Sequence, residues 1–138
     1  MPTFEPDSVQ LSEILSHYIF ARSHYRIPDQ SVMYTAFMPR SDDLRVSVFR
    51  TSGLSEPCVW NIGESVGQVS NRTLHGRGDV IAAEVRKQNL DIDPDNRPPR
   101  HANIVGWPQE KHKRQEIAQI LASSATLKLR REQQSNGS

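Results

Sequence analysis

Apolar residues occur in this chain only in short runs, and this shortness constrains the fold more than any other feature. The longest uninterrupted runs are four residues, at 18–21 and 80–83, whereas a helix that crosses a membrane needs about 20 apolar residues. The chain has 138 residues, of which 36% are hydrophobic and 24% charged, unlike the apolar-poor composition of disordered proteins. We therefore expect one folded domain at 8–131, tails at 1–7 and 132–138, and no membrane partner.

The first half of the sequence predicts one helix and two strands. A helix is expected after Asp7 or Ser8, because apolar residues recur at helical spacing at positions 11, 14, 15, 18 and 19. Strands are expected at 33–39 and 44–50, joined as a hairpin by the turn-forming residues 40–43. In the second strand Val46 and Val48 alternate with Arg45 and Ser47, which predicts one apolar face and one polar face.

The second half predicts more helices and a further strand. Ser55 is suited to cap a helix that Gly63 and Gly67 weaken, and Asp79 is suited to cap a short helix at 80–88. An edge strand at 90–92, a loop at 93–100, a strand at 101–107 and a long helix at 109–129 follow. The whole order predicts an α+β fold, in which helices cover a small, mostly antiparallel sheet.

Charge is unevenly distributed along the chain. Residues 1–96 hold nine Lys and Arg against thirteen Asp and Glu, whereas residues 97–138 hold eight against three, although the whole chain has a net charge of only +1. A basic last third is compatible with a partner that carries phosphates, and it is also a common solubility feature.

Positions 97–103 form the first candidate site. Two arginines, Arg97 and Arg100, precede His101 and Asn103, and strand alternation places these last two on one face. A histidine there can act as an acid or base, with Asn103 orienting it or a ligand. The alternative is a packing histidine that binds backbone.

Two further segments suit an anion. Lys111, Lys113 and Arg114 begin the last helix, where cations oppose the helix dipole unless an anion is bound. The glycines around Arg77, after His75, allow close backbone approach to a ligand. The alternatives are a solvated basic face and an ordinary capped turn.

Four arginines, Arg40, Arg50, Arg77 and Arg100, would form a ring around a phosphoryl-transfer site if they met in space.

The sequence contains no motif for the other common types of catalytic or metal site. The five histidines show no metal-ligand spacing, so we expect no metal and no other cofactor. No nucleophile-elbow motif supports a Ser–His–Asp arrangement. The single cysteine, Cys58, stands beside Val59 and Trp60 and reads as a core residue; the absence of a second cysteine favours a cytoplasmic location.

Three segments, SVFR at 47–50, Ile62-Gly63 and RHANIVGWP at 100–108, are similar to short uncharacterised bacterial proteins of unassigned function. The resemblance covers about residues 33–126. It implies a bacterial cytoplasmic origin and a self-contained domain, and it implies no activity.

These features support three hypotheses for function. The first is a non-catalytic accessory module that binds nucleic acid or a nucleotide through its basic last third, with binding that weakens as salt increases. The second is a metal-independent phosphodiester- or nucleotide-processing enzyme with His101 and His75 as acid and base. The third is an interaction subunit of a larger protein assembly, with Trp60 and Trp107 as anchors. The anion-binding candidates are Arg50, Arg77, Arg97, Arg100, Asn103, Lys111, Lys113 and Arg114.

Overall fold

A computed structural model describes residues 8–130, and the predicted tails at 1–7 and 132–138 lie outside this range. Its strands are β1 (Ile14–Ile19), β2 (Tyr25–Arg26), β3 (Ser31–Val32), β4 (Val46–Arg50), β5 (Gly76–Ile81), β6 (Asp91–Pro94), β7 (His101–Val105) and β8 (Thr126–Leu129). Its helices are α1 (Glu56–Ser70), α2 (Ala82–Lys87) and α3 (Lys111–Ser124), with short 3-10 helices η1 (Arg22–His24) and η2 (Tyr34–Phe37).

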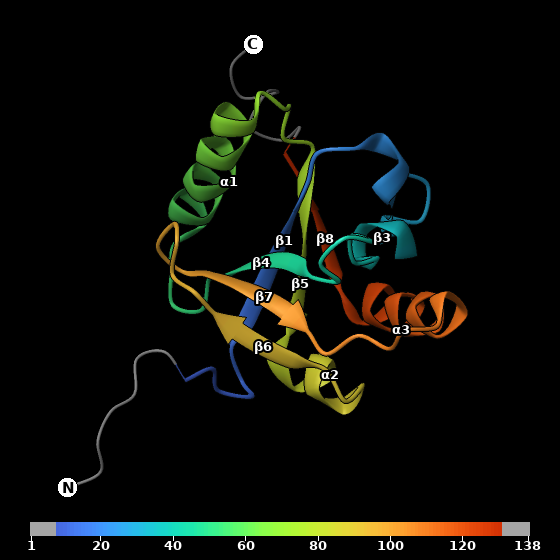
Figure 1. Cartoon of the computed structure of the whole chain (residues 1–138). Helices are drawn as coiled ribbons and strands as arrows, with labels where there is room; N and C mark the ends of the chain where they lie inside the picture. The colour runs from blue at the N-terminus through green and yellow to red at the C-terminus, as the bar shows by residue number, and fades with distance from the viewer. Residues whose placement is uncertain (1–7, 131–138) are drawn as a thin grey trace, which may run out of the picture.

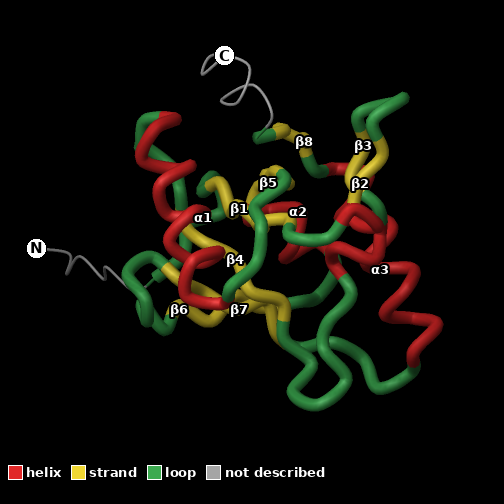
Figure 2. The backbone as a smooth tube through the Cα atoms, turned by 90° about the horizontal axis from the view of Figure 1, so that it is seen from above, coloured by secondary structure: helices red, strands yellow, loops and turns green. Residues whose placement is uncertain are grey.

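Six strands form one antiparallel sheet in the order β6-β7-β4-β1-β5-β8, while β2 and β3 form a separate two-stranded ribbon. Helix α1 covers one face of the sheet, and α2, α3 and η2 lie on the other (Figures 1 and 2). This arrangement confirms the predicted α+β class with a small, mostly antiparallel sheet covered by helices. Within the described residues, no helix combines the length and the apolar character needed to span a bilayer.

Each face of the sheet has its own core. The smaller core lies under α1 and consists of Tyr18, Phe49, Val59, Trp60 and Leu74. The larger core lies on the other face and includes fully buried side chains from β1, η2, β4, β7 and α3: Leu15, Phe37, Val48, Ile104 and Leu121. Because the central strands are buried on both faces, apolar side chains project from both of their faces.

The sheet is strongly twisted at its centre. In Figure 1, β4, β7 and β6 run across the direction of β1, β5 and β8. Strands β1 and β4 accordingly pair at only two positions, Leu15 with Arg50 and Ser16 with Phe49, and diverge beyond them. The right-handed twist of β-strands accounts for this divergence, which opens a space between the two halves of the sheet.

Several predicted elements are confirmed. Helix α1 follows Ser55, whose Oγ accepts the backbone N–H of Cys58 at 3.3 Å. Cys58 itself is exposed on the first turn of this helix, so its predicted place in the core is wrong. Strand β4 occupies most of the predicted segment 44–50, β7 most of 101–107, and β6 is an edge strand that extends two residues into the predicted loop.

Two predictions in the first half are wrong. The predicted first helix is β1. This central strand is buried on both faces, with Leu15 and Ile19 on one and Tyr18 on the other, so its apolar residues do not alternate and match a helical stripe by chance. The predicted strand at 33–39 contains η2, which packs against α3. Consequently β4 has no hairpin partner at 33–39; its neighbours are β1 and β7.

Two predictions in the second half are also wrong. Asp79 caps no helix: it lies within β5, opposite Ser16, and α2 begins only at Ala82. The predicted helix at 109–129 ends at Ser124, and residues 126–129 form the edge strand β8 instead. Four residues are too few to show a strand pattern, and pairing with β5 decides their conformation.

Candidate active site

The candidate site begins on β4 and β7, which are antiparallel neighbours. Ser47 lies opposite Asn103 and Phe49 lies opposite His101. Residues opposite one another, and residues two positions apart, project from the same face of a sheet. All four side chains therefore lie on the face that α1 covers. The Phe49 side chain is buried under α1, whereas Ser47 lies beyond the helix and is exposed.

Ser47, His101 and Asp95 form a continuous chain of hydrogen bonds, which we call the triad. The distance from Ser47 Oγ to His101 Nε2 is 2.6 Å. The distance from His101 Nδ1 to Asp95 Oδ1 is 2.7 Å. These contacts join a hydroxyl, an imidazole and a carboxylate in the order that nucleophilic serine catalysis requires.

Asp95 and His101 are each held by further contacts. Asn103 Nδ2 donates to Asp95 Oδ2 at 3.1 Å, and the backbone N–H of Arg97 donates to Asp95 Oδ1 at 3.2 Å. Partial burial disfavours the Asp95 carboxylate, but hydrogen bonds from His101, Arg97 and Asn103 outweigh this effect and lower its pKa. The His101 ring packs edge-on against Phe49, with ring centroids 5.2 Å apart. The imidazole therefore has a fixed orientation.

The protonation pattern follows from these contacts. Because the pKa of Asp95 is lowered, its side chain is a carboxylate that only accepts hydrogen bonds, so His101 Nδ1 carries the proton between them. In the neutral imidazole, Nε2 then has a free lone pair, and the Ser47 hydroxyl donates to it. Ser47 Oγ is thus hydrogen-bonded to a base that can accept its proton.

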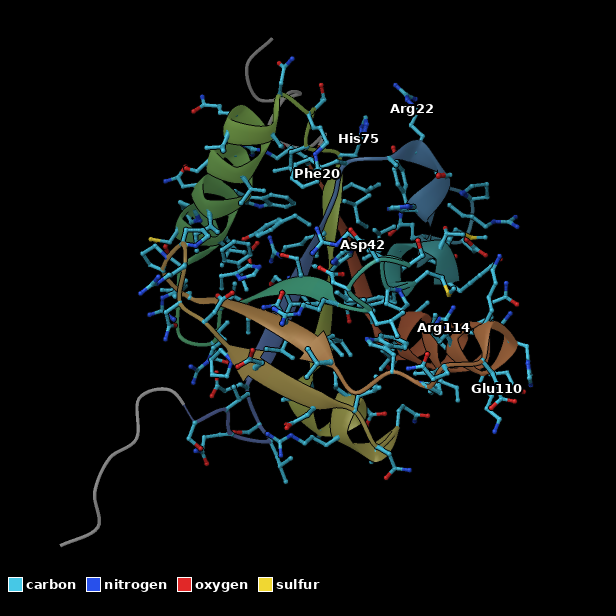
Figure 3. The ribbon with its side chains drawn as sticks, viewed as in Figure 1. Phe20, Arg22, Asp42, His75, Glu110 and Arg114 are labelled. Carbon is cyan, nitrogen blue, oxygen red and sulfur yellow. The ribbon has the colours of Figure 1, made fainter. Side chains whose placement is uncertain are left out.

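A cavity of about 360 Å³ adjoins Ser47 where β1 and β4 diverge, and we call it the arginine pocket. Its basic lining residues are Arg40, Arg45 and Arg72, and its apolar walls include Tyr18, Phe20, Met38, Phe49 and Val66. Figure 3 shows Phe20 between the end of β1 and α1. The volume falls within the usual range of small-molecule sites.

His17 lies where β1 leaves β4 and lines the same pocket. Its Nδ1 is 2.8 Å from the backbone oxygen of Ser47. A carbonyl oxygen only accepts, so Nδ1 carries the proton and Nε2 remains a hydrogen-bond acceptor. Burial lowers the pKa of His17 to about 4, which keeps the ring neutral near pH 7.

The structure brings together two of the predicted site residues on the polar face of β7. His101 and Asn103 both contact Asp95. The other predicted catalytic histidine, His75, lies just before β5, near the Tyr25 ring and beside the end of β1 that does not pair with β4 (Figure 3). Sequence reasoning missed Ser47 and Asp95, because neither stands in a motif and their meeting with His101 depends on which strands pair.

The predicted anion-binding arginines have separate partners. Arg50 forms an ion pair with Glu13 at 2.8 Å, and Arg100 donates to the backbone oxygen of Arg50. Arg77 is buried and pairs with the partly buried Asp79 and the exposed Glu56, whereas the side chain of Arg97 is exposed. Of the four arginines in the predicted ring, only Arg40 lines the arginine pocket.

The basic start of α3 lies on the opposite side of the sheet from α1. Lys111 is exposed, and Lys113 pairs with Glu110 at 3.1 Å. Arg114 donates to the backbone oxygens of Pro108 and Gln109, and Figure 3 shows it near Glu110. Internal partners thus satisfy part of the charge that predicted a phosphate site there.

Within residues 8–130, no group of three or more His, Cys, Asp or Glu side chains is arranged to hold a metal ion.

In comparisons with known proteins, the chain matches no family model, no curated protein and no solved structure. The candidate function therefore rests on the geometry of the triad and the pocket.

Proposed function

We propose that the protein is a hydrolase of carboxylic esters in which Ser47 is the nucleophile. The observation that carries this proposal is the unbroken hydrogen-bonded chain from Ser47 Oγ through His101 to Asp95, with distances of 2.6 and 2.7 Å. A surface serine has no structural need for an oriented imidazole and a carboxylate behind it. A nucleophilic serine needs both.

The reaction proceeds in two balanced steps. Ser47 Oγ attacks the ester carbonyl carbon while its proton moves to His101 Nε2; the bond to the alcohol oxygen then breaks, and His101 returns the proton to that oxygen. The acyl group is now on Ser47. Water attacks the acyl carbon and gives a proton to His101, the bond to Ser47 Oγ breaks, and Ser47 recovers its proton.

The arginine pocket supplies favourable electrostatics for this chemistry. Negative charge develops on the carbonyl oxygen when Ser47 attacks, and positive groups placed beforehand stabilise it. The arginine-lined cavity places a positive potential around Ser47. Asp95 stabilises the imidazolium that forms at the same moment, at the far nitrogen of His101.

This proposal revises the enzyme hypothesis from the sequence and is preferred to a non-catalytic module. It keeps His101 as the base and replaces His75 by Ser47. The hypothesis of a phosphate-bearing partner for the basic last third stays a prediction, as does that of an interaction subunit. Neither hypothesis is supported by a set of side chains held in place as the triad is. Lys113 and Arg114, which suggested the phosphate site, already have internal partners.

A fluorophosphonate probe tests the proposal, because it phosphonylates activated serines and releases fluoride. Trypsin cleavage after Arg45 and Arg50 yields the peptide VSVFR, in which Ser47 carries the only hydroxyl. We expect mass spectrometry to find the label on this peptide. Ser47→Ala should abolish labelling, while His101→Ala and Asp95→Asn should slow it by about a hundredfold or more.

The matched control is Ser65→Ala, which removes another exposed serine, on α1. It should label at the wild-type rate, and circular dichroism should show that each variant keeps its fold. Absence of label on VSVFR in the wild type, or equal labelling rates with and without His101, would overturn the proposal. Binding of labelled DNA and RNA at about 50 and 200 mM salt would then test the accessory-module hypothesis.

A further inference from the structure

We propose that the arginine pocket binds an oxyanion of the substrate, so that the esters hydrolysed at Ser47 carry a phosphate or carboxylate group next to an apolar body. This inference deepens the proposed function and rests on it for the reaction. The binding of the anion itself rests only on the charge and shape of the pocket.

The charge of the pocket is the first observation. Three guanidinium groups line it, and no aspartate or glutamate among residues 8–130 does so. The two histidines of the lining, His17 and His24, contribute no compensating negative charge. Since like charges gathered in a concave site raise the local potential, the pocket attracts anions.

The availability of these guanidiniums is the second observation. The Arg45 side chain is exposed, and its charge is balanced only in part by Asp43, which accepts the Arg45 backbone N–H and attracts its guanidinium but pairs directly with Arg40. Arg72 stacks over the Phe20 ring at 4.3 Å and donates Nε–H to the Ser70 hydroxyl. Within residues 8–130 it forms no ion pair with a carboxylate.

Arg40 is the third guanidinium and forms an ion pair with Asp43 at 2.6 Å. The two side chains are 67% and 36% exposed, and such solvent-exposed pairs contribute little to stability. Arg40 can therefore exchange this partner for a bound oxyanion. Guanidinium groups bind carboxylates and phosphates through two parallel N–H donors, which suits them to hold an oxyanion in a fixed position.

The walls of the pocket define the rest of the ligand. Phe20, Phe49 and Val66 offer aromatic and aliphatic contacts near the guanidiniums. His17 adds one acceptor, since its Nδ1 proton is used by the backbone oxygen of Ser47. A ligand that fits has an anionic end toward the arginines, an apolar body, and an ester carbonyl that reaches Ser47.

Equilibrium binding to the Ser47→Ala variant tests this inference without turnover. The probes are phenyl phosphate, phenylacetate and the neutral phenylacetamide, measured by isothermal titration calorimetry at low salt. We expect at least one anion to bind about tenfold more tightly than the neutral amide, because charge-assisted hydrogen bonds add to the shared apolar contacts. Comparison of the two anions shows whether the pocket selects phosphate or carboxylate.

Arginine variants locate the binding site. The double substitution Arg45→Met and Arg72→Met should weaken anion binding about tenfold or more and leave amide binding unchanged. The matched control is Arg86→Met, which removes an arginine from α2 on the opposite face of the sheet; it should bind all three probes as before. Equal affinity for the anions and the amide, or equal loss in the control, would overturn the inference.

The two proposals fail in different ways. Anion binding by Ser47→Ala together with an unlabelled wild type would support the pocket and overturn the hydrolase. Labelling of Ser47 without preferential anion binding would support the hydrolase and overturn the pocket as an oxyanion site.

Discussion

At the scale of single residues, two histidines of one sheet show how hydrogen-bond partners decide chemical role. Both His101 and His17 use Nδ1–H as a donor, the first to a carboxylate and the second to a backbone oxygen. The Asp95 carboxylate holds the proton of His101 on Nδ1, and in the proposed reaction it would stabilise the imidazolium that forms when His101 takes the Ser47 proton. The carbonyl partner of His17 bears no charge, and burial makes its protonation costly.

The lowered pKa of His17 predicts a loss of stability in mild acid. Between pH 6.5 and about 4, His17 of the unfolded chain binds a proton that the folded protein does not bind. The free energy of unfolding therefore falls as the pH falls through this window. The facing groups His24 and Arg72 also disfavour the charged ring.

Urea denaturation at pH 7 and pH 4.5 checks this prediction. His17→Asn keeps an N–H donor at the same position and removes the titrating group, so its stability should fall less than that of the wild type. The carboxylates with lowered pKa values, such as Glu13 and Asp95, affect both proteins alike. An equal fall in both proteins would contradict the role of His17.

At the scale of elements, a glycine on α1 allows the helix to pack directly against side chains of the smaller core. A Cβ atom on Gly63 would lie 2.6 Å from the Tyr18 ring and 2.9 Å from the Leu74 side chain. The glycine that weakens the isolated helix therefore permits its packing over the smaller core. Tyr18 also donates its hydroxyl to the backbone oxygen of Val59 on α1.

Gly63→Ala should consequently destabilise the protein although alanine is the better helix former. Overpacking against Tyr18 and Leu74 is expected to lower the free energy of unfolding by about 1–3 kcal/mol. The matched control, Ser65→Ala on the exposed side of the same helix, should change it by less than about 0.5 kcal/mol. Chemical denaturation of both variants measures the difference, and a more stable Gly63→Ala protein would show that α1 is loosely packed.

At the scale of the whole molecule, a buried polar network ties α1 to the sheet. The Arg77 side chain of β5 is 2% exposed, stacks over the Trp60 ring, and pairs with Asp79 at 3.1 Å and Glu56 at 2.8 Å. Asp79 in turn accepts the Ser16 hydroxyl of β1. Arg77 thus connects two neighbouring strands with the first turn of the helix that covers them.

Removal of Arg77 should therefore destabilise the whole fold. Arg77→Met leaves Asp79 without its cation in a partly buried site, and breaking a buried ion pair in this way costs about 3–5 kcal/mol. Glu56→Gln is the matched control: its side chain is 56% exposed, and the glutamine can still accept a hydrogen bond from the buried Arg77, so we expect a smaller loss of about 1 kcal/mol. Urea denaturation compares the two, and equal losses would show that the buried partner contributes no more than the exposed one.

Some of these elements are predictable because their signals are local. The Ser55 cap predicts α1, and the alternation of Val46 and Val48 with Ser47 predicts β4. Strand β1 is not predictable in this way, because its burial on both faces removes the alternation. Strand β8 depends on pairing with β5, so its four residues have no signal of their own.

The sequence alone determined which residues are polar on each strand: Ser47 on one, and His101 with Asn103 on another. Only the tertiary structure decided that these two strands are neighbours in a register that places Ser47 beside His101, 54 positions away. It likewise decided that β1 and β4 diverge to open the arginine pocket. The physical reason is that strand pairing, register and sheet twist arise from burial of both faces at once, which no local pattern encodes.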